Sequence, residues 1–439
     1  MFSVKNWVNT HGWQNWAGNV KGIPTQSLLP HDTKQLSNLI WNIQKQGKTV
    51  RVTGAAHSFS PIAKPDDVAI SLHNMRGLID INRETGDVTF WAGTYLYEIG
   101  PILAQFGLAL SNMGDIHEQT IAGAVSTGTH GTGVTLGSLS SQVVMWGFVD
   151  GLGNYHEHTR GEDDLSKALH LSLGLLGVLV KVTIKTVPLY SLRCQSLHYP
   201  FEEAKKAWAS MIREHRHVEW FYFPGSEQIQ VKIMDQISIV EQSKKSKTVE
   251  DFKNNVIENG LLYVFSEVCK KQPRATKWVS NIASKSVPTG VKKGLSYEIF
   301  PTSRKVKFLE MEYAIPLENF NDCMEEIHFT LKSHPFKVHF PIECRTAKGE
   351  SGFLSPTQNR ECAFIAFHMY KGMDEKDYFR WVKTLMAKYN GRPHWGKMNS
   401  LTKEQIIDLY PQFPLFLKLR EEYDPENIFV TKYFRKIID

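Results

Sequence analysis

The sequence predicts an α+β protein built from two domains, with strands and helices in both halves of the chain. Short strand-like runs alternate with amphipathic helical stretches in the first half, where glycine-rich turns are frequent. The second half also alternates strand-like runs with amphipathic helices. Pro188 marks the expected boundary between these halves. Strands and helices packed in layers around separate cores are typical of such a pattern.

Length and composition place the chain among ordinary globular proteins. Its 439 residues suffice for a large core and for two or three domains. A hydrophobic content of 42% with 22% charged residues excludes disordered and fibrous classes. The 51 Lys and Arg exceed the 45 Asp and Glu, but they are scattered along the chain. A nucleic-acid binder would concentrate basic charge on one stripe, so we expect no nucleic-acid partner.

The first half begins with a well-marked helix and strand. Asp32 is a plausible helix cap, apolar residues follow at helical spacing from Leu36 to Ile43, and Gly47 offers a stop. A strand rich in β-branched residues then runs over 49–53 and enters the loop 54–58. Further strands are expected at 68–72, 88–92, 143–149 and 178–187, with a helix over 95–106 that ends at Gly107.

The second half supports a separate substrate domain. Its expected strands are 220–223, 230–233 and 308–314, and its expected helices are 202–215 and 317–333. Residues 243–288 are polar and irregular, which is compatible with a helical excursion or a lid. The predicted organisation is a cofactor-binding domain over 1–190, a substrate domain over 191–415, and a C-terminal segment, 416–439, that returns to the first domain.

Cysteine usage and hydropathy predict a cytoplasmic protein without a metal site or a transmembrane segment. The five cysteines form no CxxC pair and no close spacing with histidine, as expected of reduced thiols. The N-terminus lacks the apolar core of a signal peptide. The longest mostly apolar run, 171–180, is about half of the 20 or so residues needed to cross a bilayer.

Two segments of the first half have the composition of cofactor-binding loops. The loop 54–60 follows a strand, and its small residues would let backbone N–H groups approach an anionic pyrophosphate. Small and hydroxylated residues over 121–133 could hydrogen-bond a diphosphate or a flat ring. There is no G-x-G-x-x-G after a strand and no P-loop, so neither a Rossmann nor a Walker site is indicated. Taken singly, each segment also fits an ordinary surface loop.

In this order and spacing, the segments resemble the PCMH-type FAD-binding domain of the vanillyl-alcohol oxidase flavoprotein family. The similarity is greatest to its aldonolactone and alditol oxidase branch and covers nearly the whole chain. It is carried by the strand and G-x-x-H-S loop at 51–60, GLALSNMG at 107–114, AG-x-x-x-x-GTHG-x-G at 122–133 and LG-x-LG-x-L at 173–179. The resemblance implies a two-domain flavoprotein, with an FAD-binding domain and an α+β substrate (cap) domain that contains an antiparallel sheet.

The resemblance also implies where FAD binds. In branch members the histidine of the HS motif carries the flavin through its 8α-methyl group, which implies a covalent link at His57; a histidine that merely caps a loop is the alternative. The implied cofactor-binding residues are Thr53, Gly54, Ala55, Ala56, His57, Ser58, Phe59, Ser111, Gly114, Asp115, Thr120, Ala122, Gly123, Ser126, Thr127, Thr129, His130, Gly177, Val178, His394 and Lys397.

Substrate chemistry is expected from the second half. Glu343 and Arg345 lie two apart on an expected strand and therefore point to one face. From the residues alone, an exposed salt bridge is the simpler interpretation. The downstream FLSP at 353–356 resembles the branch's WLSP, and in alditol oxidases the matching E-x-R places a carboxylate at substrate hydroxyls and an arginine near the flavin's pyrimidine edge.

Two further motifs complete the expected site. His368 lies in F-H-M-Y, whose histidine matches alditol oxidase and whose Met-Tyr resembles gulonolactone oxidase. Residues 392–397 resemble the branch's PHW-[AG]-K motif, so Lys397 is expected to bring a positive charge to the flavin–substrate junction. The DPENIF stretch at 424–429 resembles the family's closing segment, where the chain returns to the FAD domain.

The expected reaction is oxidation of a sugar alcohol or of a lactone's ring hydroxyl. His368 would take the hydroxyl proton with help from Lys397, while the carbon-bound hydrogen leaves as hydride to flavin N5. Arg345 or Lys397 would stabilise the reduced ring, and Glu343 and Ser126 would orient the substrate. Small residues at 123–124 favour O2 as the acceptor. The alternatives are a dehydrogenase linked to a dye or cytochrome, and a flavin-binding protein without turnover.

Overall fold

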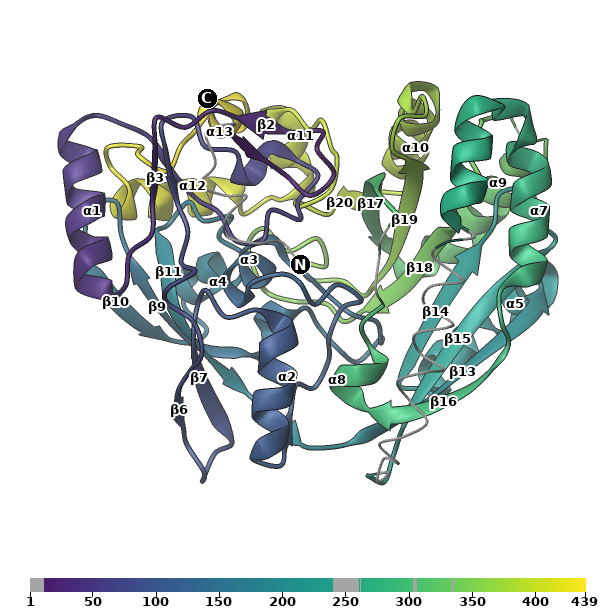
Figure 1. The fold of residues 1–439 in the computed structure, drawn as a ribbon, viewed down its shortest axis with the longest axis horizontal. Helices are drawn as coiled ribbons and strands as arrows, with labels where there is room; N and C mark the ends of the chain where they lie inside the picture. The colour runs from purple at the N-terminus through teal and green to yellow at the C-terminus, as the bar shows by residue number, and fades with distance from the viewer. Residues whose placement is uncertain (1–11, 240–259, 261, 303–305, 334) are drawn as a thin grey trace.

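The computed structural model describes residues 12–239, 260, 262–302, 306–333 and 335–439, which form two lobes (Figure 1). One lobe holds most of the first half of the chain together with the C-terminal helices, and the other holds the second half. Each lobe has its own large hydrophobic core. The expected α+β class with an antiparallel substrate-domain sheet is confirmed.

The first lobe contains two sheets. An antiparallel sheet has the order β10 (Tyr155–Thr159), β9 (Val143–Val149), β11 (Val178–Lys185), β7 (Asp87–Trp91) and β6 (Leu78–Ile81). A parallel sheet has the order β3 (Gln26–Leu28), β5 (Val68–Ile70) and β4 (Val50–Val52). Two short pairs join β1 (Trp13–Gln14) to β2 (Lys21–Gly22), and β8 (Leu108–Ala109) to β12 (Val187–Pro188).

Its helices follow the sequence pattern closely. They are α1 (Thr33–Lys45), α2 (Leu96–Gln105), α3 (Ile121–Thr127) and α4 (Asp164–His170). The side chain of Asp32 accepts a hydrogen bond from the Gln35 backbone N–H at 2.7 Å, so the expected cap of α1 is confirmed. The helix buries Leu36, Ile40 and Ile43, which lie on one face because they recur at helical spacing.

The second lobe is built on an antiparallel sheet of eight strands. Their order is β16 (Gly290–Leu295), β13 (Ser191–Pro200), β15 (Gln228–Ile237), β14 (His217–Tyr222), β18 (Ile342–Ala347), β19 (Cys362–Tyr370), β17 (Phe308–Pro316) and β20 (Arg392–Pro393). Figure 1 shows α5 (Phe201–Glu214), α7 (Thr276–Ser286), α9 (Phe320–Lys332) and α10 (Lys376–Lys388) together on the outer side of this sheet. The short α8 (Ser296–Ile299) follows β16. The opposite face of the sheet is therefore left for the first lobe and the site.

The C-terminal helices cross back to the first lobe (Figure 1). They are α11 (Lys403–Leu409), α12 (Phe413–Tyr423) and α13 (Lys432–Ile438). Ile406, Phe416 and Phe434 are fully buried in the first core. The division at residues 190 and 415 stays a proposal, and because 415 falls inside α12 the packing favours an earlier return.

The segment 243–288 is only partly within the described residues. Residues 243–259 and 261 lie outside them, whereas 262–271 and α7 are helical. The Ser280 hydroxyl donates to the Pro224 carbonyl at 2.8 Å, and Val279 is buried in the second core. The described part is thus a helical excursion packed on the sheet, which is one of the two structures expected for it.

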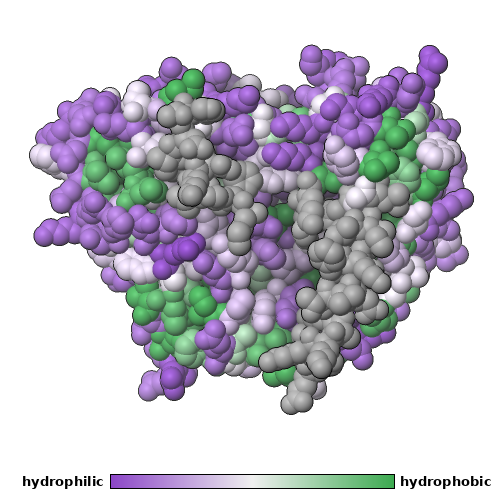
Figure 2. Space-filling view, viewed as in Figure 1, coloured by the Kyte–Doolittle hydropathy of each residue, from purple (hydrophilic) through white to green (hydrophobic). Residues whose placement is uncertain are grey.

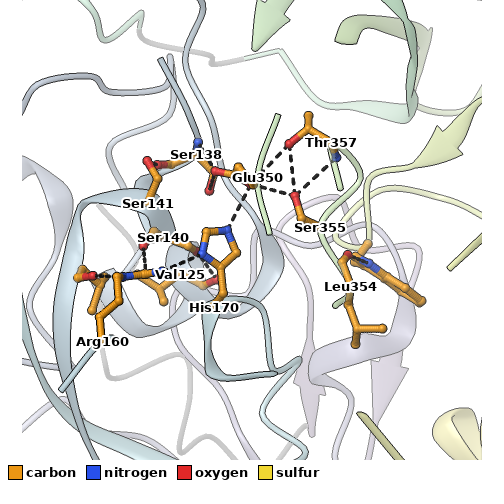
Figure 3. Close-up of polar contacts among 12 residues, drawn as sticks. Val125, Ser138, Ser140, Ser141, Arg160, His170, Glu350, Leu354, Ser355 and Thr357 are labelled. Carbon is orange, nitrogen blue, oxygen red and sulfur yellow. Dashed lines mark hydrogen bonds and ion pairs between the residues drawn. The ribbon is translucent and has the colours of Figure 1, made fainter. Parts of the chain in front are cut away.

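A buried carboxylate joins the two lobes. Glu350, in the loop after β18, accepts hydrogen bonds at Oε1 from the backbone N–H and the hydroxyl of Ser138, both at 2.7 Å (Figure 3). Its Oε2 accepts from the hydroxyls of Ser355 at 2.6 Å and Thr357 at 3.3 Å, and lies 3.0 Å from Nε2 of His170. Ser138 and His170 belong to the first lobe, so this carboxylate ties the loop to it.

On the face drawn in Figure 2, hydrophilic side chains dominate and hydrophobic ones gather in separate patches. No helix among the described residues is both long enough and apolar enough to span a bilayer.

Candidate active site

Two neighbouring cavities adjoin the loop that carries His57, one within the first lobe and one between the lobes. The narrow cavity has a volume of about 110 Å³ and is lined by first-lobe residues from β4, the loop after it, α3 and the start of β11. The broad cavity has a volume of about 600 Å³ and is lined from both lobes. Ala55, His57, Ser58, Thr127 and Tyr95 are among the residues that line both cavities. The two spaces therefore meet at the loop that carries His57.

The loop 54–58 presents its backbone to the cavities. Thr53 N–H donates to Ile70 O at 2.8 Å before the loop, and Phe59 N–H donates to Gly396 O at 2.6 Å after it. Among the described residues, none accepts a hydrogen bond from the backbone N–H groups of 54–58. Consecutive free N–H groups in such a loop form a concave site for an anion, as expected for a diphosphate.

Small residues are required where the loop meets α3. A Cβ atom on Gly54 would overlap the hydroxyl oxygen of Thr120, which caps α3 by accepting from Gly123 N–H. Gly177 has a φ of +151°, and a Cβ there would lie 2.5 Å from Val149 O. Ala56 has a φ of +55°, in the left-handed region. Small residues at these positions let the wall of the narrow cavity pack closely, and the N–H groups of 54–58 along that cavity fit the diphosphate of FAD.

His57 is held at the junction of the two cavities. Its ring stacks on Trp16, with centroids 5.8 Å apart and planes at 24°. Burial lowers the pKa of His57 to about 4, with Glu118 opposing and Lys397 adding to the shift. The imidazole is therefore neutral at pH 7, and one ring nitrogen keeps its lone pair.

The PHWGK segment, residues 393–397, is hydrogen-bonded to the residues that directly follow the loop 54–58. Besides the bond from Phe59 N–H to Gly396 O, the Ser60 hydroxyl donates to Trp395 O at 2.7 Å. The buried Trp395 indole donates to Leu354 O at 2.8 Å. These bonds bring Lys397, 340 residues away in sequence, into the cavity that His57 also lines.

Strand register brings the second-lobe side chains together on one face. β17 and β19 pair Glu310 with His368, and Glu312 with Ala366. β18 and β19 pair Glu343 with the same Ala366. Residues directly opposite one another in a ladder share a face, so Glu310, Glu312, His368 and Glu343 all line the broad cavity. The small side chain of Ala366, on β19, lies between Glu312 on β17 and Glu343 on β18.

Lys397 is paired with both glutamates of β17. Its Nζ lies 2.6 Å from Glu310 Oε1 and 3.8 Å from Glu312 Oε2. Burial alone would raise the pKa of Glu310, but Lys397 and His368 outweigh it and lower that pKa to about 2. For Lys397, burial is outweighed by the two carboxylates, which raise its pKa. Lys397, Glu310 and Glu312 therefore stay charged at neutral pH.

Arg345 is surrounded by carboxylates. It forms an ion pair with Glu343, and its other contacts are Asp115 at 3.1 Å and Glu219 at 3.1 Å. Burial would lower the pKa of Arg345, but Glu343, Asp115 and Glu219 raise it well above its ordinary value. Burial raises the pKa of Glu219 to about 7, with Arg345 opposing the shift. Arg345 is thus a permanent cation held from three sides.

The cavity histidines differ in their hydrogen bonding. His368 Nδ1 lies 2.9 Å from the Pro341 carbonyl, which can only accept, so Nδ1 is the donor in this contact. His394 Nδ1 accepts from Gly396 N–H at 3.0 Å, and burial lowers its pKa to about 4. His130 Nε2 lies 3.3 Å from Glu312 Oε1. His130 Nδ1 likewise lies 2.8 Å from the Gly131 carbonyl, so His368 and His130 both direct Nε2 toward a carboxylate of β17, Glu310 and Glu312 respectively.

Nearly all site residues predicted from the sequence line one of the two cavities. Those in the narrow cavity are Thr53, Gly54, Ala55, Ala56, His57, Ser58, Thr120, Ala122, Gly123, Ser126, Thr127, Gly177 and Val178. Those in the broad cavity include Phe59, Gly114, Asp115, Thr129, His130, Glu343, Arg345, His368, His394 and Lys397.

Ser111 and Ser126 differ in position from the other predicted residues. Ser111 lines neither cavity; its N–H donates to Gln142 Oε1, and its carbonyl accepts from Arg216. Ser126 lines the narrow cavity only, whereas Glu343, its expected companion in orienting the substrate, lines the broad one. Its position favours contact with the cofactor over contact with the substrate.

Sequence reasoning missed three carboxylates of the site, Glu310, Glu312 and Glu219. A signal was present, since Glu310 and Glu312 lie two apart in an otherwise apolar strand and must share a face. Glu219 likewise interrupts the apolar strand β14. A charged residue in a strand buried on both faces needs a partner, and that partner was not readable from the strand alone.

Within the part of the chain that the structure describes, two groups have the spacing of metal ligands: His130, Glu312 and His394, and Asp115, Glu219 and Glu343. In the first group, Lys397 already lies beside Glu312, and Gly396 N–H occupies Nδ1 of His394. In the second, the guanidinium of Arg345 lies among the three carboxylates. Protein cations thus compensate both sets of charges.

Comparison with known proteins gives consistent matches. A family model described as D-arabinono-1,4-lactone oxidase matches residues 182–437, and one described as FAD binding domain matches residues 24–159. L-gulono-1,4-lactone dehydrogenase of Mycobacterium tuberculosis is 33% identical over 97% of this chain and 99% of the relative. L-gulonolactone oxidase of Mus musculus is 30% identical over 97% and 98%. Cholesterol oxidase of Brevibacterium sterolicum has a similar fold, with a TM-score of 0.77 at 16% identity over 98% of this chain and 96% of that one.

Proposed function

The chain belongs to the D-arabinono-1,4-lactone oxidase family, and we propose that it oxidises a hydroxyl-bearing carbon of an aldono-1,4-lactone or sugar alcohol. The motif resemblance noted in the sequence is confirmed as family membership, and the chain is an FAD-dependent oxidoreductase. One observation carries the assignment of roles: the cavity that begins at the His57 loop continues to Glu343, Arg345, His368 and Lys397. The residues proposed for the cofactor and those proposed for the substrate thus line the same cavity.

FAD, when bound, accepts a hydride at N5 and later passes two electrons to an acceptor. We assign its diphosphate to the N–H groups of 54–58, from which no described residue accepts a hydrogen bond, and to the neighbouring small residues of α3, which line the same cavity. Gly54 and Gly177 let the cavity wall pack closely on its neighbours, since an added Cβ would collide with Thr120 at Gly54 and with the Val149 carbonyl at Gly177.

We further propose that His57 carries the flavin covalently. Family resemblance suggests the link, and the neutral ring at the cavity junction, held by Trp16, supplies a nitrogen with a lone pair. In the His57→Ala variant, flavin should leave the protein on acid precipitation, whereas it should stay with the wild-type pellet. Flavin retained in the variant's pellet would place the tether at another residue.

His368 is the proposed general base. Because Nδ1 donates to Pro341 O, Nε2 can accept the substrate's hydroxyl proton. The imidazolium then formed lies 3.6 Å from Glu310 Oε1, which stabilises it. Lys397 Nζ, 2.6 Å from the same oxygen, partly compensates the negative charge of that carboxylate and can donate hydrogen bonds to the substrate.

Arg345 and Glu343 are the proposed substrate-orienting pair. Glu343 accepts hydrogen bonds from hydroxyl groups, and Arg345 offers its N–H groups to ring or carbonyl oxygens. The three carboxylates around Arg345 hold its guanidinium in place. We expect Ser126 to contact the cofactor, in keeping with its place in the narrow cavity.

The proposed electron acceptor is O2, with hydrogen peroxide as product. Gly123 lines the narrow cavity, and a Cβ there would meet only Thr120 Oγ1, at 3.3 Å; Ala124 is fully buried. A dehydrogenase that uses a dye or cytochrome is the second candidate, since relatives are named both oxidase and dehydrogenase. Aerobic turnover with peroxide formation supports the oxidase, and turnover with a dye but without peroxide supports the dehydrogenase.

Anaerobic flavin reduction tests the activity itself. L-gulono-1,4-lactone, D-arabinono-1,4-lactone or xylitol should bleach the flavin absorbance of the purified protein. Unchanged absorbance across this panel would favour the third candidate, a flavin-binding protein without turnover. We also propose a cytoplasmic location, because all five cysteines are free thiols.

A further inference from the structure

The broad cavity carries an excess of negative charge. Its lining includes five carboxylates (Asp115, Glu118, Glu310, Glu312 and Glu343) and three cations (Arg76, Arg345 and Lys397). With neutral histidines the lining has a formal charge of −2, because five negative charges face three positive ones. Glu219, behind Arg345, adds a further carboxyl group.

Each of these cations already has a carboxylate partner. Lys397 contacts Glu310 and Glu312, at 2.6 and 3.8 Å. Arg345 contacts Asp115, Glu219 and Glu343, and Arg76 lies 3.6 Å from Glu98. An anionic ligand would need a cation to replace the water it loses on burial. Within the described lining, every Lys and Arg is already compensated.

Glu310 and Glu312 are the carboxylates that compensate the positive charge of Lys397. Both project from β17 toward the cavity, and both are almost completely buried. If they were neutral, the Lys397 ammonium would be an uncompensated cation facing the cavity and would attract a ligand carboxylate. As charged groups they instead accept hydrogen bonds from ligand hydroxyls, which neutral polyhydroxy compounds supply.

We propose that Glu310 and Glu312 make the site selective for neutral polyhydroxy substrates, so that it accepts an aldonolactone and rejects the corresponding aldonate. The inference rests on the proposed function and deepens it. A lactone is a neutral internal ester, and its hydrolysis gives an open-chain carboxylate with the same carbon skeleton and hydroxyls. Charge is thus a feature by which the site can separate the substrate from its hydrolysis product.

Three ligands separate charge from shape: L-gulono-1,4-lactone, sodium L-gulonate and L-gulonamide. The amide is open-chain like the gulonate, nearly isosteric with it, and neutral. Their affinities for the holoenzyme are measured from the concentration dependence of the flavin absorbance change, which requires binding but not turnover. The amide should bind at least about tenfold more tightly than the gulonate, because like charges brought together in a buried site repel strongly. An amide-to-gulonate ratio below tenfold overturns the proposal and assigns any rejection of gulonate to ring shape.

Variants test the residues. In Glu312→Gln or Glu310→Gln the amide-to-gulonate preference should fall more than threefold, since Lys397 is then less compensated. Glu361→Gln, which removes an exposed carboxylate paired with Arg213, is the matched control and should keep the wild-type ratio. A preference reduced by less than threefold in both cavity variants overturns the role of these glutamates. Flavin bleaching by the lactone is recorded separately; its failure would overturn the proposed function and leave the charge comparison valid.

Discussion

Two buried groups of carboxylates in this protein differ in their partners. Glu350 and Glu310 have nearly equal side-chain exposure, 6% and 7%. Glu350 accepts hydrogen bonds from one backbone N–H and three hydroxyls and lines neither cavity (Figure 3). Glu310 and Glu312 instead face Lys397 and the cavity histidines. Burial by itself therefore does not identify a functional carboxylate, whereas the nature and direction of its partners do.

The two groups differ because their carboxylate oxygens differ in whether a ligand can reach them. The oxygens of Glu350 are occupied by donors from both lobes, so its charge stabilises the contact between them. The oxygens of Glu310 and Glu312 border a space that a ligand can enter, and their charges govern the lysine and histidine beside them. Variants of the two groups should accordingly separate activity from stability.

The largest effect is expected at the proposed base. His368→Gln should lower kcat/KM by about 10²–10⁴-fold, because general-base assistance of that size is lost. The free energy of unfolding should change little, since glutamine can still donate to Pro341 O. Steady-state kinetics and urea denaturation measure the two quantities. The matched control is His339→Gln, at a buried histidine that contacts Ser266 and lines neither cavity; it should keep kcat/KM within about threefold. Equal losses of activity in both variants would refute the role of His368.

The opposite pattern is expected at the contact between the lobes. Glu350→Gln should lower the free energy of unfolding by about 3 kcal/mol, because buried His170 loses its carboxylate partner and the hydroxyls of Ser138 and Ser355 lose a charged acceptor. The kcat/KM of the folded variant should remain within about threefold of wild type. A loss of activity without a loss of stability would show that Glu350 acts on the site instead.

The stability difference should depend on pH. Burial alone would raise the pKa of Glu350, but His170 and the hydrogen bonds of Ser355 and Ser138 outweigh it and lower that pKa well below its ordinary value. A lowered pKa means that the stabilisation is fully present above the unfolded-state pKa, about 4.3, and is lost as pH falls below it. Chemical denaturation of wild type and Glu350→Gln between pH 7 and pH 3 should therefore show their difference shrinking toward the acid end. A constant difference would contradict this linkage.

The smallest effect is expected at the surface. Glu361→Gln removes an exposed ion pair with Arg213, whose distance is 2.7 Å. Exposed pairs contribute only about 0–1 kcal/mol, so unfolding by urea should change by about 0.5 kcal/mol or less. A larger change would mean that the exposure of a carboxylate and the type of its partner do not determine its contribution to the free energy of unfolding.

The sequence predicted several local features of the fold correctly, including two strands that carry or precede candidate site residues. The Asp32 cap, the strand before the His57 loop and the strand that holds Glu343 and Arg345 are all present. Each is a short-range feature, since capping, β-branched runs and the alternation of strand side chains depend on residues a few positions apart. The placement of Ser126, in α3, and Ser111, in a loop, was less predictable, because a residue that resembles a motif can still face a neighbouring element.

By itself, the sequence determined the fold class, the two segments that border the narrow cavity and the pairing of Glu343 with Arg345 on one strand face. Only the tertiary structure decided that Glu310, Glu312 and Glu219 surround the cations of the site and that Glu350 joins the lobes. The reason is geometric: spacing along a strand or helix is set by backbone periodicity. Contacts such as Glu310 with Lys397, 87 residues apart, require strand order, register and the packing of both lobes.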